Sequence, residues 1–211
     1  MAGILITFEG IDGSGKSTQI QMLEHEFNKL GVEYKTFREP GGTELSEKIR
    51  EILLDNENIE LISTSESLLF AAARAQLTAE KIKPAIEKGE FVICDRFTDS
   101  TIAYQGYGRG LDIKQLEEIN YIATDGLTPD ITFILDINPE TAAVRMKAEA
   151  SDRMEEMGMD FFRRIRGGYR QIKDQNPNRC QVINGAQSPD NVFKEIKEIV
   201  MNKFEGILTC S

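Results

Sequence analysis

Five short stretches with the composition of buried strands recur along the chain. They are ILITF at 4–8, VEYKTF at 32–37, FVIC at 91–94, ITFIL at 131–135 and CQVI at 180–183. Each is four to six residues long and rich in Ile, Val, Phe or Tyr, which is typical of strands in a sheet that is covered on both faces. We therefore predict five strands at these positions.

Between these stretches, apolar residues recur every three or four positions, which is the period of an amphipathic helix. In the first such segment, Ile20, Leu23, Phe27 and Leu30 follow this spacing. The pattern predicts helices over 16–30, 44–54, 65–88, 113–125, 139–147, 160–175 and 189–204. Strands that alternate with helices indicate an α/β fold, in which helices flank a parallel sheet of about five strands in three layers. Without a repeat or a long linker, residues 1–211 are expected to form a single domain.

A glycine-rich stretch, FEGIDGSGKST at 8–18, joins the first predicted strand to the first helix. Gly10, Gly15, Lys16 and Ser17 fill the phosphate-loop pattern G-x-x-x-x-G-K-S/T. Glycines allow successive N–H groups to point toward a phosphate, and the helix N-terminus adds the positive end of its dipole. The lysine supplies a positive charge for the outer phosphates, and the serine hydroxyl is a ligand for Mg²⁺. The alternative is an ordinary glycine turn between a strand and a helix.

Composition excludes several other classes of protein. The net charge of −10 and the lack of a long basic run argue against nucleic acid as a partner. His25 is the single histidine, so a site that needs a His–Ser pair or histidine metal ligands is excluded. Cys94, Cys180 and Cys210 lack metal-binding spacing, and we expect the first two to be buried thiols. Neither a signal peptide nor a membrane span is expected, so the predicted location is the cytoplasm.

Charged residues follow two of the predicted strands, where ligands gather in open α/β sheets. Arg38 follows the second strand and Arg96 the third, while Arg50 and Arg74 lie on predicted helices. Arginine has a planar fork of donors that suits phosphate, so these residues suggest a second anion beside the first. Asp95 ends the third strand, as the magnesium carboxylate of phosphate-loop enzymes does, and Asp136 is a weaker candidate with the same local sequence. An ion pair at the surface is the ordinary alternative for each arginine.

Taken together, the motifs resemble those of the bacterial thymidylate kinase family, which are phosphate-loop nucleoside monophosphate kinases. The resemblance runs nearly end to end and rests on FEGIDGSGKST, FREPGGT, LLFAAAR, CDRFTDSTIAYQGYGRG, PDITFILD and SDRMEEMGMDFFRRIRGGY. It implies the phosphate-loop kinase fold and transfer of the γ-phosphoryl group of ATP to dTMP with Mg²⁺, for dTTP synthesis. It also implies a homodimer. The alternatives are a kinase for dUMP or a purine monophosphate, and a nucleotide-binding switch without a small acceptor. The guanine-binding switch motif N-K-x-D is absent.

The resemblance also assigns residues to sites. ATP would be bound by Gly10, Ile11, Asp12, Gly13, Ser14, Gly15, Lys16, Ser17, Thr18, Arg145, Gly185 and Ala186. The acceptor dTMP would be bound by Glu39, Arg50, Phe70, Arg74, Arg96, Thr101, Tyr104 and Gln105, and Arg38 would assist. Phe70 would stack on the thymine ring, Arg74 would reach a base carbonyl, and Tyr104 would crowd out a ribose 2′-hydroxyl. Ser17 and Asp95 would hold the metal, and Asp12, Lys16, Arg96 and Arg153 would be catalytic.

The last of these assignments depends on a predicted mobile lid over about 145–158, a polar and charged segment between two helices. One branch of the family carries a basic residue in the phosphate loop, where this chain has Gly13. The charge on the phosphoryl group in transfer would then be balanced from the lid, and Arg153 is the first candidate. Arg145 and Lys147 are the other candidates, and the alternative for Arg145 is that it covers the adenine face.

Overall fold

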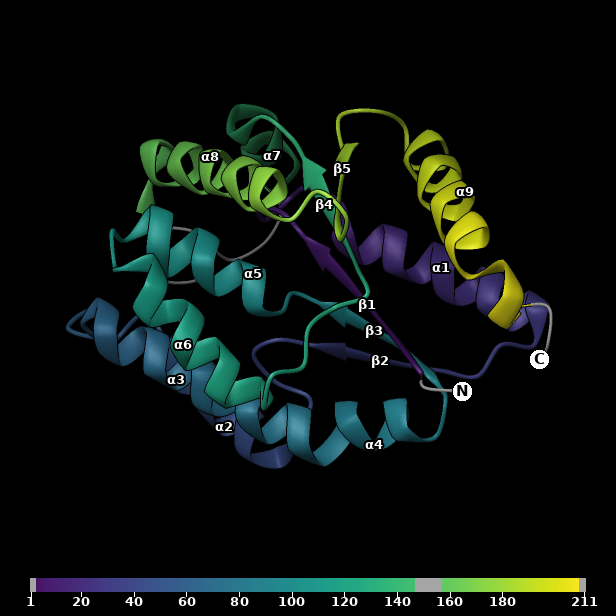
Figure 1. Cartoon of the computed structure of the whole chain (residues 1–211). Coiled ribbons are helices and arrows are strands. Elements are labelled where there is room, and N and C mark those ends of the chain that lie inside the picture. The colour runs from purple at the N-terminus through teal and green to yellow at the C-terminus, as the bar shows by residue number, and fades with distance from the viewer. Residues whose placement is uncertain (1–2, 147–156, 209–211) are drawn as a thin grey trace.

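All five predicted strands pair in parallel into one sheet with β1 at its centre (Figure 1). The computed structural model describes residues 3–146 and 157–208. In these residues the strand order is β2-β3-β1-β4-β5. The strands are β1 (Ile4–Glu9), β2 (Tyr34–Arg38), β3 (Phe91–Asp95), β4 (Ile131–Asp136) and β5 (Cys180–Asn184). The carboxyl ends of parallel strands lie at one edge, so Glu9, Arg38, Asp95 and Asp136 end on the same side of the molecule.

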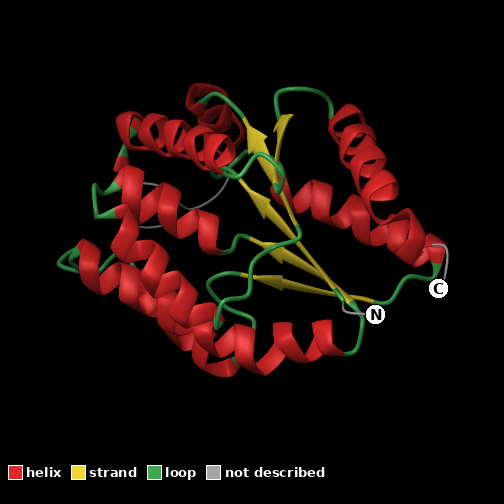
Figure 2. Ribbon diagram, in the orientation of Figure 1, coloured by secondary structure: helices red, strands yellow, loops and turns green. Residues whose placement is uncertain are grey.

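Helices cover both faces of this sheet (Figure 2). They are α1 (Lys16–Leu30), α2 (Glu44–Leu54), α3 (Ser63–Leu77), α4 (Lys83–Glu87), α5 (Thr98–Thr101), α6 (Ile113–Thr124), α7 (Pro139–Met146), α8 (Met159–Gln175) and α9 (Pro189–Leu208). Two π-helical segments, η1 (Thr78–Ile82) and η2 (Ile102–Gly108), continue α3 and α5. The three-layer α/β architecture expected from the alternating pattern is therefore confirmed.

Alternation along β1 divides the core between the two faces. Ile4, Ile6 and Phe8 pack in the cluster that the apolar residues of α1 and α9 form, and these two helices lie together on one side of the sheet (Figure 1). Leu5 packs on the opposite face with residues of α3, η1 and β3. A strand turns successive side chains to opposite faces, so Glu9 projects to the same side as Leu5, toward α5 and α8.

Several element boundaries differ from the sequence prediction, and two of the differences have a clear local cause. The second strand begins at Tyr34 rather than at Val32, because Gly31 ends α1 in the left-handed conformation and the Val32 N–H bonds back to the Phe27 carbonyl. The long helix predicted over 65–88 is interrupted by η1 just before Pro84. Proline has no N–H to donate into an α-helical ladder, and a wider π-turn accommodates that gap.

A larger omission is the helical segment Thr98–Gly108, for which the pattern predicted no element. It combines threonines with Gly106 and Gly108, which are weak helix formers. Contacts with α8 and α6 support it instead. This segment carries four residues of the candidate site, so its absence from the prediction matters for function.

Other expectations can be compared directly. Cys94 and Cys180 are buried and free, as predicted, and His25 is exposed on α1. In the part of the chain that the structure describes, no helix is long and apolar enough to cross a membrane. Residues 147–156 of the predicted lid lie outside the described residues, and so do Lys147, Arg153 and Cys210.

Candidate active site

Two adjoining pockets lie at the carboxyl ends of β1, β2 and β3. The loop pocket, of about 640 Å³, is lined by residues 12–19 together with Arg38, Asp95, Arg145, Met146, Gly185, Gln187, Pro189 and Val192. The Phe70 pocket is lined by Pro40, Leu54, Phe70, Arg74, Ser100, Thr101, Tyr104 and Gln105. Asp12, Glu39, Arg50 and Arg96 line both pockets. Two ligands bound in these pockets would therefore meet at these four charged residues.

Backbone conformation shapes the glycine loop. Gly10, Gly13 and Gly15 have φ values of 136°, 75° and 97°, which L-residues with side chains rarely adopt. Lys16 begins α1 and is 7% exposed, and its Nζ donates to the carbonyls of Gly10 at 3.2 Å and Ile11 at 3.3 Å. Burial and the nearby charge of Arg96 both lower the pKa of Lys16. The ammonium group is thus hydrogen-bonded to carbonyls of its own loop.

Close packing by α7 explains why the loop has glycine at position 13. A Cβ on Gly13 would lie 2.7 Å from the carbonyl oxygen of Ala142. From the same helix, Arg145 reaches over the loop, and its Nη1 donates to the carbonyls of Gly13 at 3.4 Å and Gly185 at 3.1 Å. A charged side chain at position 13 is therefore excluded by the backbone of α7, and Arg145 is a basic residue that the described part of the chain brings there.

Asp12 and Arg96 form an ion pair between the two pockets. Arg96 Nη2 donates to Asp12 Oδ1 at 2.6 Å and to the Tyr104 hydroxyl at 3.0 Å, and that hydroxyl donates to Asp12 Oδ2 at 3.1 Å. Burial disfavours the Asp12 carboxylate, but the charges of Arg96 and Lys16 outweigh it and lower the pKa of Asp12 to about 2. Arg96 has φ 69°, a conformation that non-glycine residues hold only where the surrounding structure enforces it.

A second carboxylate, Glu9, stabilises the segment that adjoins Arg96. It is fully buried at the end of β1 and accepts from the Phe97 N–H at 2.8 Å, the Ser100 hydroxyl at 2.5 Å and the Tyr169 hydroxyl at 2.8 Å. Burial raises the pKa of Glu9 to about 7, the charge of Asp99 acts in the same direction, and the Ser100 hydrogen bond and Arg96 oppose the rise. Glu9 therefore fixes the backbone that follows Arg96 and the first turn of α5.

This buried carboxyl group leads to a prediction about stability. Its pKa is about 4.5 when unshifted and about 7 in the folded protein, so between these values the folded state binds more protons than the unfolded chain. Stability due to Glu9 must therefore fall as the pH rises through that window. Glu9→Gln removes this ionisation, so its stability relative to wild type should improve from pH 4.5 to pH 7 by on the order of 3 kcal/mol.

Urea unfolding at several pH values measures this difference. Glu118→Gln, which changes an exposed glutamate on α6, is the control, and its difference in unfolding free energy from wild type should not change with pH. If the difference for Glu9→Gln is also independent of pH, the prediction is wrong.

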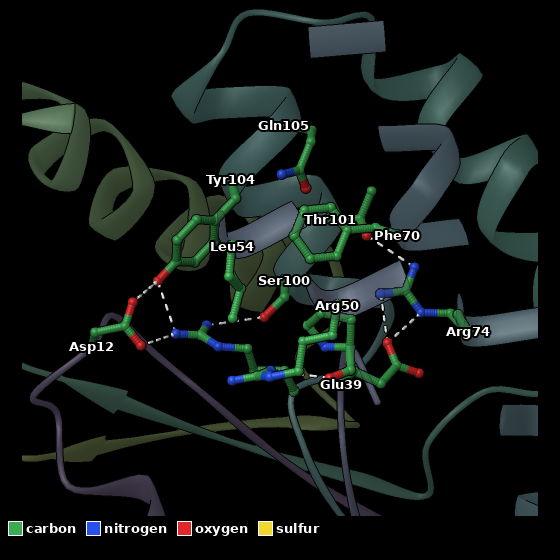
Figure 3. Close-up of a pocket in the computed structure, with 12 residues that line it drawn as sticks. Asp12, Glu39, Arg50, Leu54, Phe70, Arg74, Ser100, Thr101, Tyr104 and Gln105 are labelled. Atoms are coloured by element: carbon green, nitrogen blue, oxygen red, sulfur yellow. Dashed lines mark hydrogen bonds and ion pairs between the residues drawn. The ribbon is translucent and has the colours of Figure 1, made fainter. Parts of the chain in front are cut away.

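At its far end the Phe70 pocket holds the residues expected to meet a base. Figure 3 shows Phe70, Thr101 and Gln105 grouped there, away from Asp12. Arg74 is 2% exposed and donates within the protein: Nε to Glu39 Oε2, Nη1 to Thr101 Oγ1 and Asn120 Oδ1, and Nη2 to the Phe97 carbonyl. Its Nη2 also lies 2.7 Å from Glu39 Oε2 in an ion pair. A guanidinium has five N–H groups and four of them donate to these acceptors, so at most one remains for a ligand.

The remaining predicted residues take the following places. Ser17 Oγ lies 3.4 Å from Asp95 Oδ2 in the loop pocket, whereas Asp136 is paired with Arg166 and Arg170. Arg50 Nη1 donates to the Pro40 carbonyl at 3.0 Å, and Arg38 pairs with Glu47 at 2.9 Å. Gly10 and Ile11 are buried beneath the loop, and Ala186 is exposed outside both pockets.

Several residues of the site were missed by sequence reasoning. Leu54 follows Arg50 by one helical turn on α2, a spacing that could have placed both in one pocket. Ser100 shares a helical face with Thr101, Tyr104 and Gln105, but no helix was predicted there. Glu9 had no signal of its own, because its partners lie far away in the sequence.

Comparisons with known proteins agree with this geometry. A family model described as thymidylate kinase matches residues 8–196. The thymidylate kinase of Chlorobaculum tepidum is 49% identical over 203 residues, which are 92% of this chain and 94% of that protein. The thymidylate kinase of Caldanaerobacter subterraneus subsp. tengcongensis is 46% identical and covers 98% of this chain and 99% of its own length. A crystal structure of thymidylate kinase from Ehrlichia chaffeensis matches 95% of this chain and 99% of its own with a TM-score of 0.78 at 39% identity. The chain therefore belongs to the thymidylate kinase family.

Proposed function

We propose that this protein transfers the γ-phosphoryl group of ATP to dTMP and releases ADP and dTDP, the precursor of dTTP. The observation that carries this proposal is the junction of the two pockets: a phosphate loop in one, an aromatic pocket in the other, and Arg96 paired with Asp12 between them. Membership of the thymidylate kinase family supports the choice of acceptor.

On the donor side, the loop N–H groups and Lys16 would hold the phosphates of ATP, and Arg145 with Gly185 would lie against the adenosine. The Ser17 hydroxyl and the Asp95 carboxylate are oxygen ligands of the kind that Mg²⁺ prefers, so these residues fit the metal. When bound, Mg²⁺ would neutralise charge on the transferring phosphates.

On the acceptor side, Phe70 offers a flat apolar wall for a pyrimidine ring, and Arg50 and Arg96 lie where the monophosphate would have to meet the loop. An oxygen of that phosphate attacks the γ-phosphorus while the bond from this phosphorus to the bridging oxygen of ADP breaks. Little covalent work falls to the protein, because positioning and charge neutralisation account for most of the catalysis. Arg96 and Lys16 supply positive charge within the described residues, and Arg153 is our candidate from the lid.

A panel of acceptors tests the proposal. ADP release is measured with dTMP, dUMP, dCMP, dGMP and no acceptor, each with Mg²⁺ and ATP. We expect dTMP to give the highest kcat/KM. Equal release without acceptor would favour a nucleotide switch, and preference for a purine or for dUMP would favour another monophosphate kinase.

Tyr104 gives a prediction about the sugar. It is 6% exposed, its hydroxyl is held by Arg96 and Asp12, and its ring lies beneath the Arg96 guanidinium at 4.8 Å. A ring fixed so firmly would collide with an added 2′-hydroxyl. Tyr104→Ala should therefore reduce the preference for deoxyribose over ribose monophosphates by about tenfold or more.

The measurement is the ratio of kcat/KM for dTMP and its ribose analogue. Tyr121→Ala, at an exposed tyrosine on α6, is the matched control. If the ratio is the same in Tyr104→Ala as in the control, Tyr104 does not select the sugar.

We further propose that the protein acts as a homodimer in the cytoplasm. Helix α3 packs against both α2 and α6, and large apolar side chains are exposed on all three helices. These side chains, each at least 46% exposed, are Leu45, Ile52, Leu68, Tyr121 and Ile122. Exposed apolar side chains of this kind are expected to be covered by a protein partner. Light scattering that gives only the mass of one chain, 23.7 kDa, would contradict the dimer.

A further inference from the structure

One side chain of the Phe70 pocket has its polarity set by a buried neighbour. Gln105 lies on η2, is 2% exposed and donates through Nε2 to Glu66 Oε1 at 3.0 Å. Glu66 comes from α3, is fully buried, and is paired with Arg109, whose Nη2 lies 2.8 Å from Glu66 Oε2. A carboxylate accepts hydrogen bonds and cannot donate them, so the amide nitrogen of Gln105 has to face Glu66.

The other end of that amide is consequently an acceptor. Among the described residues, none donates a hydrogen bond to Gln105 Oε1, and the residue lines the Phe70 pocket. Without Glu66, the amide could rotate by 180° and present its NH₂ group instead, because the two ends of an amide have almost the same shape. Glu66 thus decides which hydrogen-bonding group the pocket presents at this point.

A donor lies one helical turn before it. Thr101 Oγ1 accepts from Arg74 Nη1 at 2.9 Å, so its own hydroxyl hydrogen remains available to the pocket. In Figure 3, Thr101 and Gln105 lie beside Phe70, the side chain with the flat apolar face. The pocket therefore offers a donor and an acceptor close together at the edge of a ring stacked on Phe70.

We propose that Glu66, held by Arg109, is a positioning residue that fixes Gln105 as an acceptor and thereby restricts the pocket to pyrimidines with an imide N–H. This inference rests on the proposed function and adds the basis of its selection between bases. Thymine and uracil carry a carbonyl beside a ring N–H, which complements Thr101 and Gln105. Cytosine carries an amino group beside an unprotonated ring nitrogen, so its lone pair would face Gln105 Oε1. A site rejects a base that sets two buried acceptors against each other far more strongly than a base that merely lacks an apolar contact.

The test compares dTMP with dCMP in Glu66→Gln, whose new amide can either accept from or donate to Gln105. We expect the ratio of kcat/KM for dTMP over dCMP to fall by roughly ten- to a hundred-fold, partly through a gain for dCMP. Glu80→Gln is the matched control, since Glu80 accepts from Gln76 in the same kind of pair, at 3.0 Å, but is exposed and outside both pockets. Its ratio should equal that of wild type.

Glu66→Gln removes the Glu66 carboxylate that pairs with Arg109. If this single variant does not fold, the double variant Glu66→Gln with Arg109→Met, which removes both charges of the pair, is tested in its place. A fall in the ratio in either variant, with the control unchanged, supports the inference. A ratio that stays constant while both activities fall equally would show that Glu66 is only structural and would overturn it. The wild-type assay separates the two proposals: a wild-type protein that does not phosphorylate dTMP defeats the proposed function instead.

Discussion

Lys16→Ala is expected to lose almost all phosphoryl transfer while it stays folded. The Lys16 ammonium is held above the loop by the carbonyls of Gly10 and Ile11, and its Nζ lies 4.0 Å from Asp12. These contacts limit the movement of the ammonium group, so its positive charge is already in position before the γ-phosphoryl group is transferred. Removing a preorganised charge of this kind costs about 10²–10³-fold in kcat or more, which is on the order of 3–4 kcal/mol.

The fold should tolerate this change, because alanine is the best helix former and Lys16 is the first residue of α1. Lys29→Ala, an exposed lysine in the last turn of the same helix, is the matched control. Steady-state ADP release and urea unfolding of both variants separate activity from stability. Turnover within about tenfold of wild type in a folded Lys16→Ala protein would remove this loop from the active site.

Arg96→Met is expected to have the second largest effect. Arg96 Nη1 donates to the Gly10 carbonyl at 3.0 Å, its Nη2 pairs with Asp12, and its guanidinium lines both pockets. Methionine keeps most of the volume and meets the same backbone strain at φ 69°, so the change removes the charge and the hydrogen bonds of the guanidinium. We expect kcat/KM for dTMP to fall by about 10²–10³-fold, with a smaller change in the KM for ATP.

A second readout follows from Asp12. Burial disfavours its charge, and Arg96 is the largest of the influences that lower its pKa to about 2. Without that charge the pKa of Asp12 must rise, so the variant should lose activity toward acid pH where wild type does not. The pH profile of kcat/KM tests this, with Arg170→Met as the control, an exposed arginine paired with Asp136. A profile of unchanged shape would show that Arg96 does not set the ionisation of Asp12.

Local patterns were sufficient for most of the fold. Apolar runs, helical periodicity and the glycine pattern depend on residues close together in the chain, and they placed the five strands, the loop before α1 and the order of elements. The ends of parallel strands meet at one edge, so the positions of Arg38, Asp95 and Arg96 beside the loop also followed from the sequence. The choice of dTMP came from family motifs, because periodicity carries no information about a substrate.

Tertiary structure decided how the polar groups pair. Glu9 and Tyr169 are 160 residues apart, Arg74 and Asn120 are 46 apart, and Glu66 and Gln105 are 39 apart. Sequence spacing predicts neighbours only within one helix or strand, so these contacts had no local signal. The same holds for the segment Thr98–Gly108, which α6 and α8 hold in a helix despite its weak propensity, and for Gly13, whose side-chain space is filled by α7. The chain itself specified the phosphate loop and the sheet edge, whereas packing between distant segments oriented the side chains that would select and hold the acceptor.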